Sequence, residues 1–309
     1  MTDQTHTSTQ LPIKVLLTGA NGQLGAELQA TCPAHIVLIA THRGTLDITQ
    51  PEQVALALTS HQPDVIINAA AYTAVDKAET DVQNAYAINH LAVKALAQAV
   101  TLWNKNQQRS LYLLHISTDF VFDGKQSTPY APTDATHPQG VYGESKLAGE
   151  KALQEYCPTA AIVRTSWLYS AYGHNFVKTM LRLMAERDSL GVVAEQVGSP
   201  TWTRTLSNTL WRWVEQKPQG IFHCSDNGVA SWYDFAIAIQ EEAFALGLIT
   251  KTIPITPLQS KQYPTPACRP AFSVMDKRST EQQLGYSLPH WRNSLRKMLM
   301  ELKQQTTIL

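Results

Sequence analysis

The chain has 309 residues, a hydrophobic fraction of 44%, a charged fraction of 16% and a formal net charge of zero. This balance is typical of a globular protein, and without a basic field neither nucleic acid nor a membrane is expected as a partner. The four cysteines form no C-x-x-C pair, which argues against a metal cluster or a disulfide scaffold and favours the cytoplasm. No apolar run approaches the roughly 20 residues that span a bilayer, and the polar residues 1–11 are expected to form a disordered tail.

Short apolar runs alternate with helical patterns through the first half of the chain. The predicted strands are 13–18, 36–40, 64–71, 111–118 and 160–166. The helices predicted between them begin at Gln23, at the capping-box pattern of Thr49 and Glu52, at 84 and at 141. Strands this apolar, alternating with helices, predict an α/β fold built on a Rossmann-type, doubly wound parallel sheet with helices on both faces.

The pattern changes after about residue 170. Helices are predicted near 174–186, 203–215 and 231–246, and short strands near 191–195 and 220–224. The proline-rich segment 254–272 is expected to be irregular. We therefore predict a main domain over 12–170 and a smaller C-terminal α/β lobe over 171–309, with segments that can exchange between the two.

A glycine-rich stretch, TGANGQLG, follows the first predicted strand and opens the first predicted helix. Gly19, Gly22 and Gly25 stand where a sharp turn, a close phosphate and tight helix packing each require glycine. The helix start then offers free N–H groups to a pyrophosphate. Because the motif sits between a strand and a helix, we favour NAD(P) binding by residues 12–170 over an ordinary turn.

The loop after the second predicted strand is expected to meet the adenosine ribose. No acid occurs between Ile39 and Leu46, whereas Arg43 is present. An acid there suits a free 2′-hydroxyl, and an arginine suits a 2′-phosphate. The loop therefore favours NADPH, with NADH as the alternative if Arg43 is only a solvated surface charge.

Tyr142 and Lys146 lie four residues apart on a predicted helix, so both can face one site. Lowering the tyrosine pKa from about 10 to about 7 takes roughly 4 kcal/mol. An ammonium at about 4 Å supplies roughly that much at an effective dielectric of 20. The pair is therefore a candidate for proton transfer; the alternative is an exposed tyrosine and lysine on a helix surface.

The fourth predicted strand ends in HISTDFVFDG, at the sheet edge where ligands bind. The hydroxyls of Ser117 and Thr118 could hydrogen-bond a substrate carbonyl there, or only cap the turn. His115, in the apolar strand, is interpreted as a core histidine. A strand-end hydroxyl, a tyrosine and a lysine in this order favour a catalytic site.

Several further motifs carry a resemblance to a known family. They are TGANGQLG (18–25), LDIT (46–49), NAAAYTAVDKAE (68–79), STDFVFDG (117–124), VYGESKLAGE (141–150), RTSWLY (164–169), NFVKTM (175–180), GSPT (198–201) and YPTPACRP (263–270). On these motifs the chain resembles the extended short-chain dehydrogenase/reductases from about residue 13 to 300. The resemblance is strongest to members that use NAD(P)H to reduce the 4-keto group of dTDP-4-dehydro-β-L-rhamnose, which gives dTDP-L-rhamnose.

The resemblance implies a dTDP-sugar substrate, a monomer or homodimer, and a role for each matching residue. Thr118 would polarise the ketone, Tyr142 would donate the proton, and Lys146 would hold the nicotinamide ribose. Together with the residues singled out above, the predicted cofactor site is Gly19, Gly22, Gln23, Leu24, Gly25, Arg43, Asp47, Ile48, Ala69, Ala70, Tyr72, Tyr142 and Lys146. The predicted substrate site is Val75, Thr118, Asp119, Phe120, Trp167 and Arg269. Arg269 could clamp a diphosphate, or it could be an ordinary surface arginine.

Two departures from the family pattern bear on these expectations. Phe120 replaces the tyrosine often found after the STD triplet, and it also replaces the glutamate that related dehydratases carry there. The acids that bind magnesium in some members have no secure match, so no metal is predicted. The alternatives are another nucleotide-sugar epimerase or dehydratase of the same branch, or a catalytically silent NADP-binding regulatory subunit.

Overall fold

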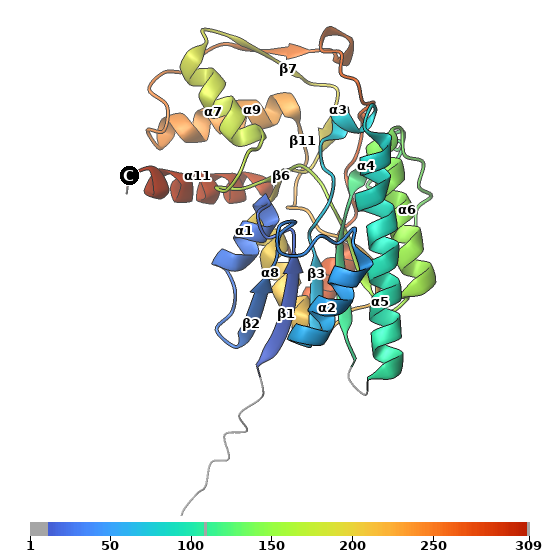
Figure 1. Cartoon of the computed structure of the whole chain (residues 1–309). Coiled ribbons are helices and arrows are strands. Elements are labelled where there is room, and N and C mark those ends of the chain that lie inside the picture. Colours follow the sequence, from blue (N-terminus) through green and yellow to red (C-terminus); the bar gives the residue numbers. More distant parts are fainter. Residues whose placement is uncertain (1–11, 108–109, 308–309) are drawn as a thin grey trace, which may run out of the picture.

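The computed structural model describes residues 12–107 and 110–307, so the predicted tail at 1–11 lies outside the described residues. Its main body is a six-stranded sheet in the order β10-β5-β4-β3-β1-β2 (Figure 1). The strands are β1 (Ile13–Thr18), β2 (Ile36–Ala40), β3 (Val65–Asn68), β4 (Tyr112–Thr118), β5 (Ala161–Thr165) and β10 (Gly220–His223). Every neighbouring pair is parallel, which confirms the predicted fold class.

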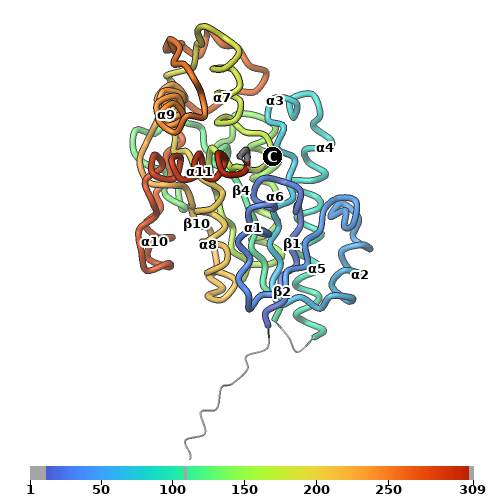
Figure 2. The backbone as a smooth tube through the Cα atoms, turned by 90° about the vertical axis from the view of Figure 1, so that its left-hand side faces the viewer, coloured from blue at the N-terminus to red at the C-terminus, as the bar shows by residue number. Residues whose placement is uncertain are grey.

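Helices cover both faces of this sheet. One layer contains α1 (Gln23–Ala30) and α8 (Thr203–Gln216), and the other contains α2 (Pro51–His61), α5 (Ala92–Asn106) and α6 (Val141–Tyr156) (Figure 2). Successive residues of a strand point to opposite faces, so Leu17 packs with Leu28 of α1 and Leu16 packs with Val54 of α2. A sheet buried on both sides in this way explains why its strands are almost continuously apolar.

The strand order reverses between β1 and β3, because β2 pairs on one side of β1 and β3 pairs on the other. In an open parallel sheet, the loops that leave two such strands diverge and open a crevice at their carboxyl ends. Gly19 follows β1 and Ala69 follows β3, so the crevice lies beside the glycine-rich stretch.

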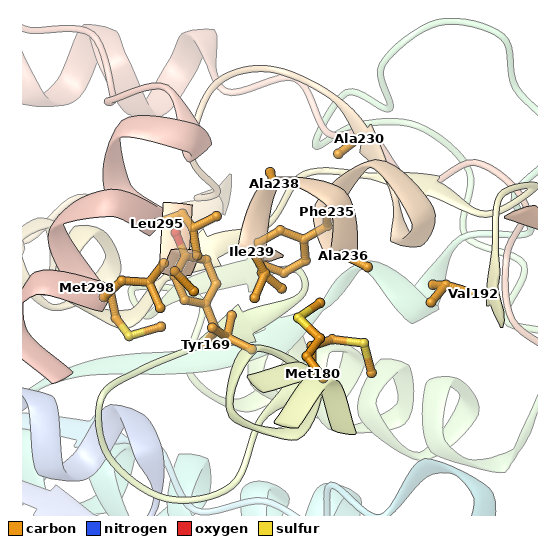
Figure 3. Packing of buried hydrophobic residues seen from close by; sticks show 14 of the residues in the cluster. Tyr169, Met180, Val192, Ala230, Phe235, Ala236, Ala238, Ile239, Leu295 and Met298 are labelled. Atoms are coloured by element: carbon orange, nitrogen blue, oxygen red, sulfur yellow. The ribbon is translucent and has the colours of Figure 1, made fainter. Parts of the chain in front are cut away.

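A smaller lobe stands beyond the carboxyl ends of the sheet (Figure 1). Its helices are α7 (Phe176–Glu186), α9 (Trp232–Ala245) and α11 (Trp291–Thr307). Three two-stranded sheets join it: β6 (Leu168–Tyr169) with β9 (Thr201–Trp202), β8 (Val197–Gly198) with β11 (Ala230–Ser231), and β7 (Leu190–Val193) with β12 (Ile255–Leu258). Tyr169, Met180, Phe235, Ile239 and Met298 pack together in its core (Figure 3).

Part of the segment after residue 170 belongs to the main body. β10 is the edge strand beside β5, and α8 packs on α1, so the segment 203–223 returns to the sheet before the chain re-enters the lobe. The segment 254–272 was predicted to be irregular, yet it contains β12 and the 3-10 turn Ser260–Gln262. No element was predicted after residue 272, where the structure forms α10 (Arg278–Leu284) and α11.

The helix predicted over 84–100 is interrupted. It consists of α4 (Val82–Tyr86), a π-helical turn (Ala87–Leu91) and α5, and it follows the short α3 (Val75–Ala78). A β-carbon on Gly149 of α6 would lie 2.2 Å from the carbonyl oxygen of Asn89, so the two helices meet closely at this turn. Asn89 there hydrogen-bonds both backbone groups of Tyr72, which ties the turn to the loop after β3.

The capping box predicted from Thr49 and Glu52 is wrong. The helix α2 begins at Pro51, and its N-cap residue makes no side-chain capping bond to the described residues. Thr49 instead donates its hydroxyl and its N–H to the carboxylate of Asp47. None of the helices within 12–107 and 110–307 is long and apolar enough to cross a membrane.

Candidate active site

A cavity of about 780 Å³ lies at the carboxyl ends of the sheet, between the main body and the lobe. It brings together residues from the glycine loop, from the ends of β2, β3 and β4, from α6 and from the lobe. The predicted site residues that line it are Gly19, Gly22, Gln23, Leu24, Gly25, Arg43, Asp47, Ile48, Ala69, Ala70, Val75, Thr118, Asp119, Phe120, Tyr142, Lys146, Trp167 and Arg269. Tyr72 does not line it: its phenol donates to Asp81, away from the cavity.

The glycine loop has the shape that a pyrophosphate needs. Gly19 has a φ of +75°, and a β-carbon there would come within 2.7 Å of the backbone of Ala69 and Ala70. A β-carbon on Gly25 would come within 2.3 Å of the Gly19 carbonyl oxygen, so α1 packs tightly on the loop. Gly22 is the N-cap of α1, and no side chain among the described residues caps the helix there. The first-turn N–H groups therefore stay open to an anion, and the loop fits a dinucleotide.

The loop after β2 places one cation and one anion together. Arg43 is 83% exposed, and its Nε donates to Asp47 at 3.3 Å. Bonds from Thr49 hold the pKa of Asp47 below its usual range, with the charge of Arg43 adding a smaller part. His42 also lines the cavity beside Arg43. The guanidinium keeps free donors, so a 2′-phosphate could share it with the carboxylate.

Tyr142 occupies the first turn of α6, where its ring packs edge-on against Phe120 at a centroid distance of 5.4 Å. Burial raises the pKa of the phenol to about 12; a hydrogen bond with Thr118 opposes the rise, and the charge of Asp119 adds to it. The expectation that Lys146 lowers this pKa toward 7 is therefore wrong for the structure. The phenol carries its proton throughout the neutral range.

Burial is the main cause of the raised pKa of Tyr142, and the Lys146 ammonium is held by other partners. Lys146 is 2% exposed, and its Nζ donates to the Ile116 carbonyl oxygen at 2.6 Å. Nζ also lies 3.4 Å from Nε2 of His115. Burial lowers the pKa of Lys146 to about 8, although the charge of Glu150 acts in the opposite direction. The lysine thus faces the last residues of β4 as well as the cavity.

His115 is buried, as expected of a core histidine, and it also supports the site. Its Nδ1 lies 3.0 Å from the amide nitrogen of Asn68, whose oxygen accepts from Thr18 at 2.6 Å. Burial holds the pKa of His115 well below its usual range, with the Lys146 charge adding to the effect. The imidazole is therefore neutral, and because the Asn68 amide nitrogen can only donate, Nδ1 is its acceptor and Nε2 carries the ring proton.

Thr118 and Asp119 form the end of β4. The Thr118 hydroxyl donates to Asp119 Oδ1 at 3.1 Å and accepts from the Phe120 N–H at 3.2 Å. Burial raises the pKa of Asp119 to about 6, although hydrogen bonds from Ser273 and Thr118 oppose the rise. Ser117 does not share this role, because its hydroxyl donates to Glu150 of α6 at 2.5 Å.

Arg269 and Trp167 close the lobe side of the cavity. Arg269 donates from both terminal nitrogens to Asp76, at 3.0 and 2.7 Å, so its guanidinium is paired with an acid at the edge of the cavity. Trp167 has a φ of +49° and stacks on Trp232 with ring centroids 3.6 Å apart.

Sequence reasoning missed several lining residues. They include Thr73, Ile88, His174 and Trp232. The signal for Trp232 is the pattern Ser-x-x-Asp at 231–234, a capping box that places the tryptophan at the start of a helix. His174 directly precedes the N-cap of α7, and nothing in its local pattern points to the cavity. Within the described part of the chain, no group of three or more His, Cys, Asp or Glu side chains is arranged to hold a metal ion.

The parallel sheet, its glycine loop and the placement of Tyr142 and Lys146 on the helix after β4 are those of the short-chain dehydrogenase/reductase fold. A family model described as "RmlD substrate binding domain" matches residues 13–304. The chain belongs to this family.

Similar proteins of known name and structure agree with this assignment. The dTDP-4-dehydrorhamnose reductase of Escherichia coli (strain K12) is 40% identical over 305 residues, which cover 96% of this chain and all of the relative. The crystal structure of such a reductase from Clostridium acetobutylicum has a TM-score of 0.87 and 39% identity, over 94% of this chain and all of that one. The structure of the Bacillus anthracis reductase, described as a complex with NADP, also has a TM-score of 0.87, with 35% identity over 94% of this chain and 99% of that one.

Proposed function

We propose that this protein uses NADPH to reduce the 4-keto group of dTDP-4-dehydro-β-L-rhamnose, giving dTDP-L-rhamnose. The observation that carries the proposal is the placement of Thr118 and Tyr142 together in the cavity that the glycine loop also lines. Relatives named dTDP-4-dehydrorhamnose reductase, about 40% identical over nearly the whole chain, support the same reaction.

The proposed cofactor residues act by shape and by backbone dipoles. Gly22, Gln23 and Leu24 would hold the pyrophosphate at the start of α1, where the N–H groups carry partial positive charge. Arg43 would contact the 2′-phosphate, and Lys146 would hold the nicotinamide ribose. NADPH, when bound, supplies the hydride that reduces the ketone.

The chain itself would supply the proton and the orientation. Reduction leaves negative charge on the sugar O4, and a protonated phenol is the form of Tyr142 that can neutralise it. With a pKa of about 12, Tyr142 is in that form at neutral pH. The Thr118 hydroxyl, which donates to Asp119 in the structure, would turn its proton to the same oxygen and polarise the carbonyl. The buried Asp119 carboxylate can accept a hydrogen bond from a sugar hydroxyl.

Phe120 favours reduction over the dehydratase alternative. Elimination of water from C5 and C6 of a sugar needs an acid–base group at that position, and a phenyl ring has no proton to give or take. Its ring stands beside Tyr142 and offers an apolar wall, which suits a sugar whose C6 is already a methyl group. The unpaired cysteines and the nucleotide-sugar substrate fit action in the cytoplasm.

NADPH oxidation against a panel of dTDP- and UDP-linked 4-keto sugars tests the proposal. We expect turnover with the dTDP-4-keto-6-deoxy sugar and little with the other nucleotides. A protein that binds NADPH but turns over no member of the panel would support the regulatory-subunit alternative. Formation of a 4-keto-6-deoxy product from dTDP-glucose and NAD would support the dehydratase alternative.

A further inference from the structure

Trp167 has a backbone conformation that tryptophan rarely adopts. Its φ of +49° lies in the left-handed region, where a bulky side chain is an outlier. Such conformations persist when the surroundings hold them, and they are concentrated at functional sites. Two residues, Trp232 and Gly198, surround the Trp167 indole.

Trp232 is the first of these residues. The two indoles lie 3.6 Å apart between ring centroids and within 5° of parallel. Aromatic rings left to themselves prefer offset or edge-on arrangements, so the backbone must impose this face-to-face pair. Trp232 is the first residue of α9, and the capping box of Ser231 and Asp234 fixes the start of that helix.

Gly198 is the second. A β-carbon there would lie 2.8 Å from Cε2 and 2.9 Å from Nε1 of Trp167, closer than real contacts allow. The indole can therefore occupy its place only because residue 198 is glycine. This explains the glycine of the GSPT motif at 198–201, which no part of the proposed mechanism uses.

Strand pairing holds the three residues in register. Gly198 pairs with Ala230 between β8 and β11, two residues before Trp232. Next to Trp167, β6 pairs with β9, and the Thr201 N–H donates to the Trp167 carbonyl oxygen at 3.2 Å. The stack is thus attached on both sides to the segment 197–202.

Both indoles line the cavity that contains Tyr142. We propose that Trp232 is a substrate-positioning residue. It backs Trp167, and the pair forms a rigid aromatic wall against which the apolar face of the deoxyhexose ring of the sugar nucleotide packs. The wall would thereby orient the C4 carbonyl toward Tyr142. The inference rests on the proposed function, and it adds Trp232 and Gly198 to the residues that determine how the sugar binds.

Three substitutions test the wall: Trp232→Leu, Trp232→Phe and Gly198→Ala. Trp232→Leu removes the stack, so we expect the KM for the 4-keto sugar nucleotide to rise about 3- to 10-fold, the typical effect of losing an aromatic pair. The KM for NADPH should stay the same. Trp232→Phe should recover part of the loss because it keeps a ring. Gly198→Ala should act like Trp232→Leu because it displaces Trp167.

Trp291→Phe is the matched control. Trp291 packs edge-on against Phe235 in the same core as Trp232 but does not line the cavity, so neither KM should change. The inference is overturned if folded Trp232→Leu and Gly198→Ala proteins keep the wild-type KM for the sugar nucleotide. It is also overturned if the KM values for sugar nucleotide and NADPH rise together, because that reports a general loss of structure.

Quenching of tryptophan fluorescence by dTDP-L-rhamnose separates this inference from the proposed reaction. Wild-type protein that binds the dTDP-sugar but does not turn over the keto sugar would contradict the reaction, and the variants would still report on the wall through their dissociation constants. Wild-type protein that neither binds nor reacts would contradict both.

Discussion

Replacing Tyr142 with phenylalanine removes the proposed proton donor and leaves the ring that packs on Phe120 at 5.4 Å. General acid catalysis is typically worth 10²- to 10⁴-fold, or roughly 3 to 5 kcal/mol of transition-state stabilisation. We expect kcat to fall by that factor. The dissociation constant for NADPH should change little, because the phenol is not part of the glycine loop and the fold around the ring is retained.

The assay is steady-state NADPH oxidation with the 4-keto sugar nucleotide, together with a pH profile. The pKa of the phenol is raised from 10 to about 12, so its proton is present at neutral pH and is lost only as pH rises toward 12. Tyr142 should therefore cause no decline in rate between pH 7 and 9. A Tyr142→Phe protein that keeps most of its kcat would remove Tyr142 from the mechanism. A wild-type decline near pH 7 that the substitution abolishes would refute the raised pKa.

Three further predictions concern the cofactor, the substrate and the fold. Arg43→Ala should weaken the binding of NADPH roughly five- to tenfold and leave the binding of NADH nearly unchanged, since a hydrogen bond to a charged group at an exposed site contributes about 1 kcal/mol. The KM values for the two cofactors measure this. Equal losses would show that Arg43 does not contact the 2′-phosphate. Because the pKa of Asp119 is raised to about 6, its carboxylate exists above that pH and is lost as pH falls through it. The kcat/KM for the sugar nucleotide should therefore decline below about pH 6, and Asp119→Asn should abolish that decline. Glu150→Ala should lower the free energy of unfolding by roughly 3 to 5 kcal/mol, because it leaves Arg164 buried without its partner; chemical denaturation measures this.

The size of the last effect depends on burial. The side chains of Arg164 and Glu150 are 3% and 1% exposed, and the pair is bonded at 2.7 Å. Arg182 and Glu186 form a comparable pair at 2.8 Å on the surface of α7, where both are more than half exposed. Arg182→Ala is the control, and it should cost under about 1 kcal/mol. Equal losses for the two pairs would contradict the role of burial.

The sheet could be predicted from the sequence because its strands are buried on both faces. In the run IKVLLT at 13–18 the only charged residue is Lys14, near its start; the last four residues are all buried, and the glycine loop follows directly. Local patterns of this kind also located Tyr142 and Thr118. The placement of β10 could not be predicted in this way, because its partner β5 lies more than fifty residues earlier and only tertiary packing brings them together.

The electrostatics of the site were the least predictable part. A lysine four residues after a tyrosine suggests a direct effect on the phenol, yet the Lys146 ammonium binds the Ile116 carbonyl oxygen, and burial dominates the pKa of Tyr142. Arg269 was predicted either to clamp a diphosphate or to be a surface charge, and Asp76, distant in the chain, pairs with it. In both cases the partner comes from another element, β4 for Lys146 and α3 for Arg269, which a single stretch of sequence does not show.

One isotope measurement tests the proposed reaction most directly. The protein is incubated with dTDP-4-dehydro-β-L-rhamnose and NADPH that carries deuterium at both C4 positions of its nicotinamide. The account predicts dTDP-L-rhamnose with one deuterium, located at C4 of the sugar. A product without deuterium at C4, or no product while NADPH still binds, would contradict it.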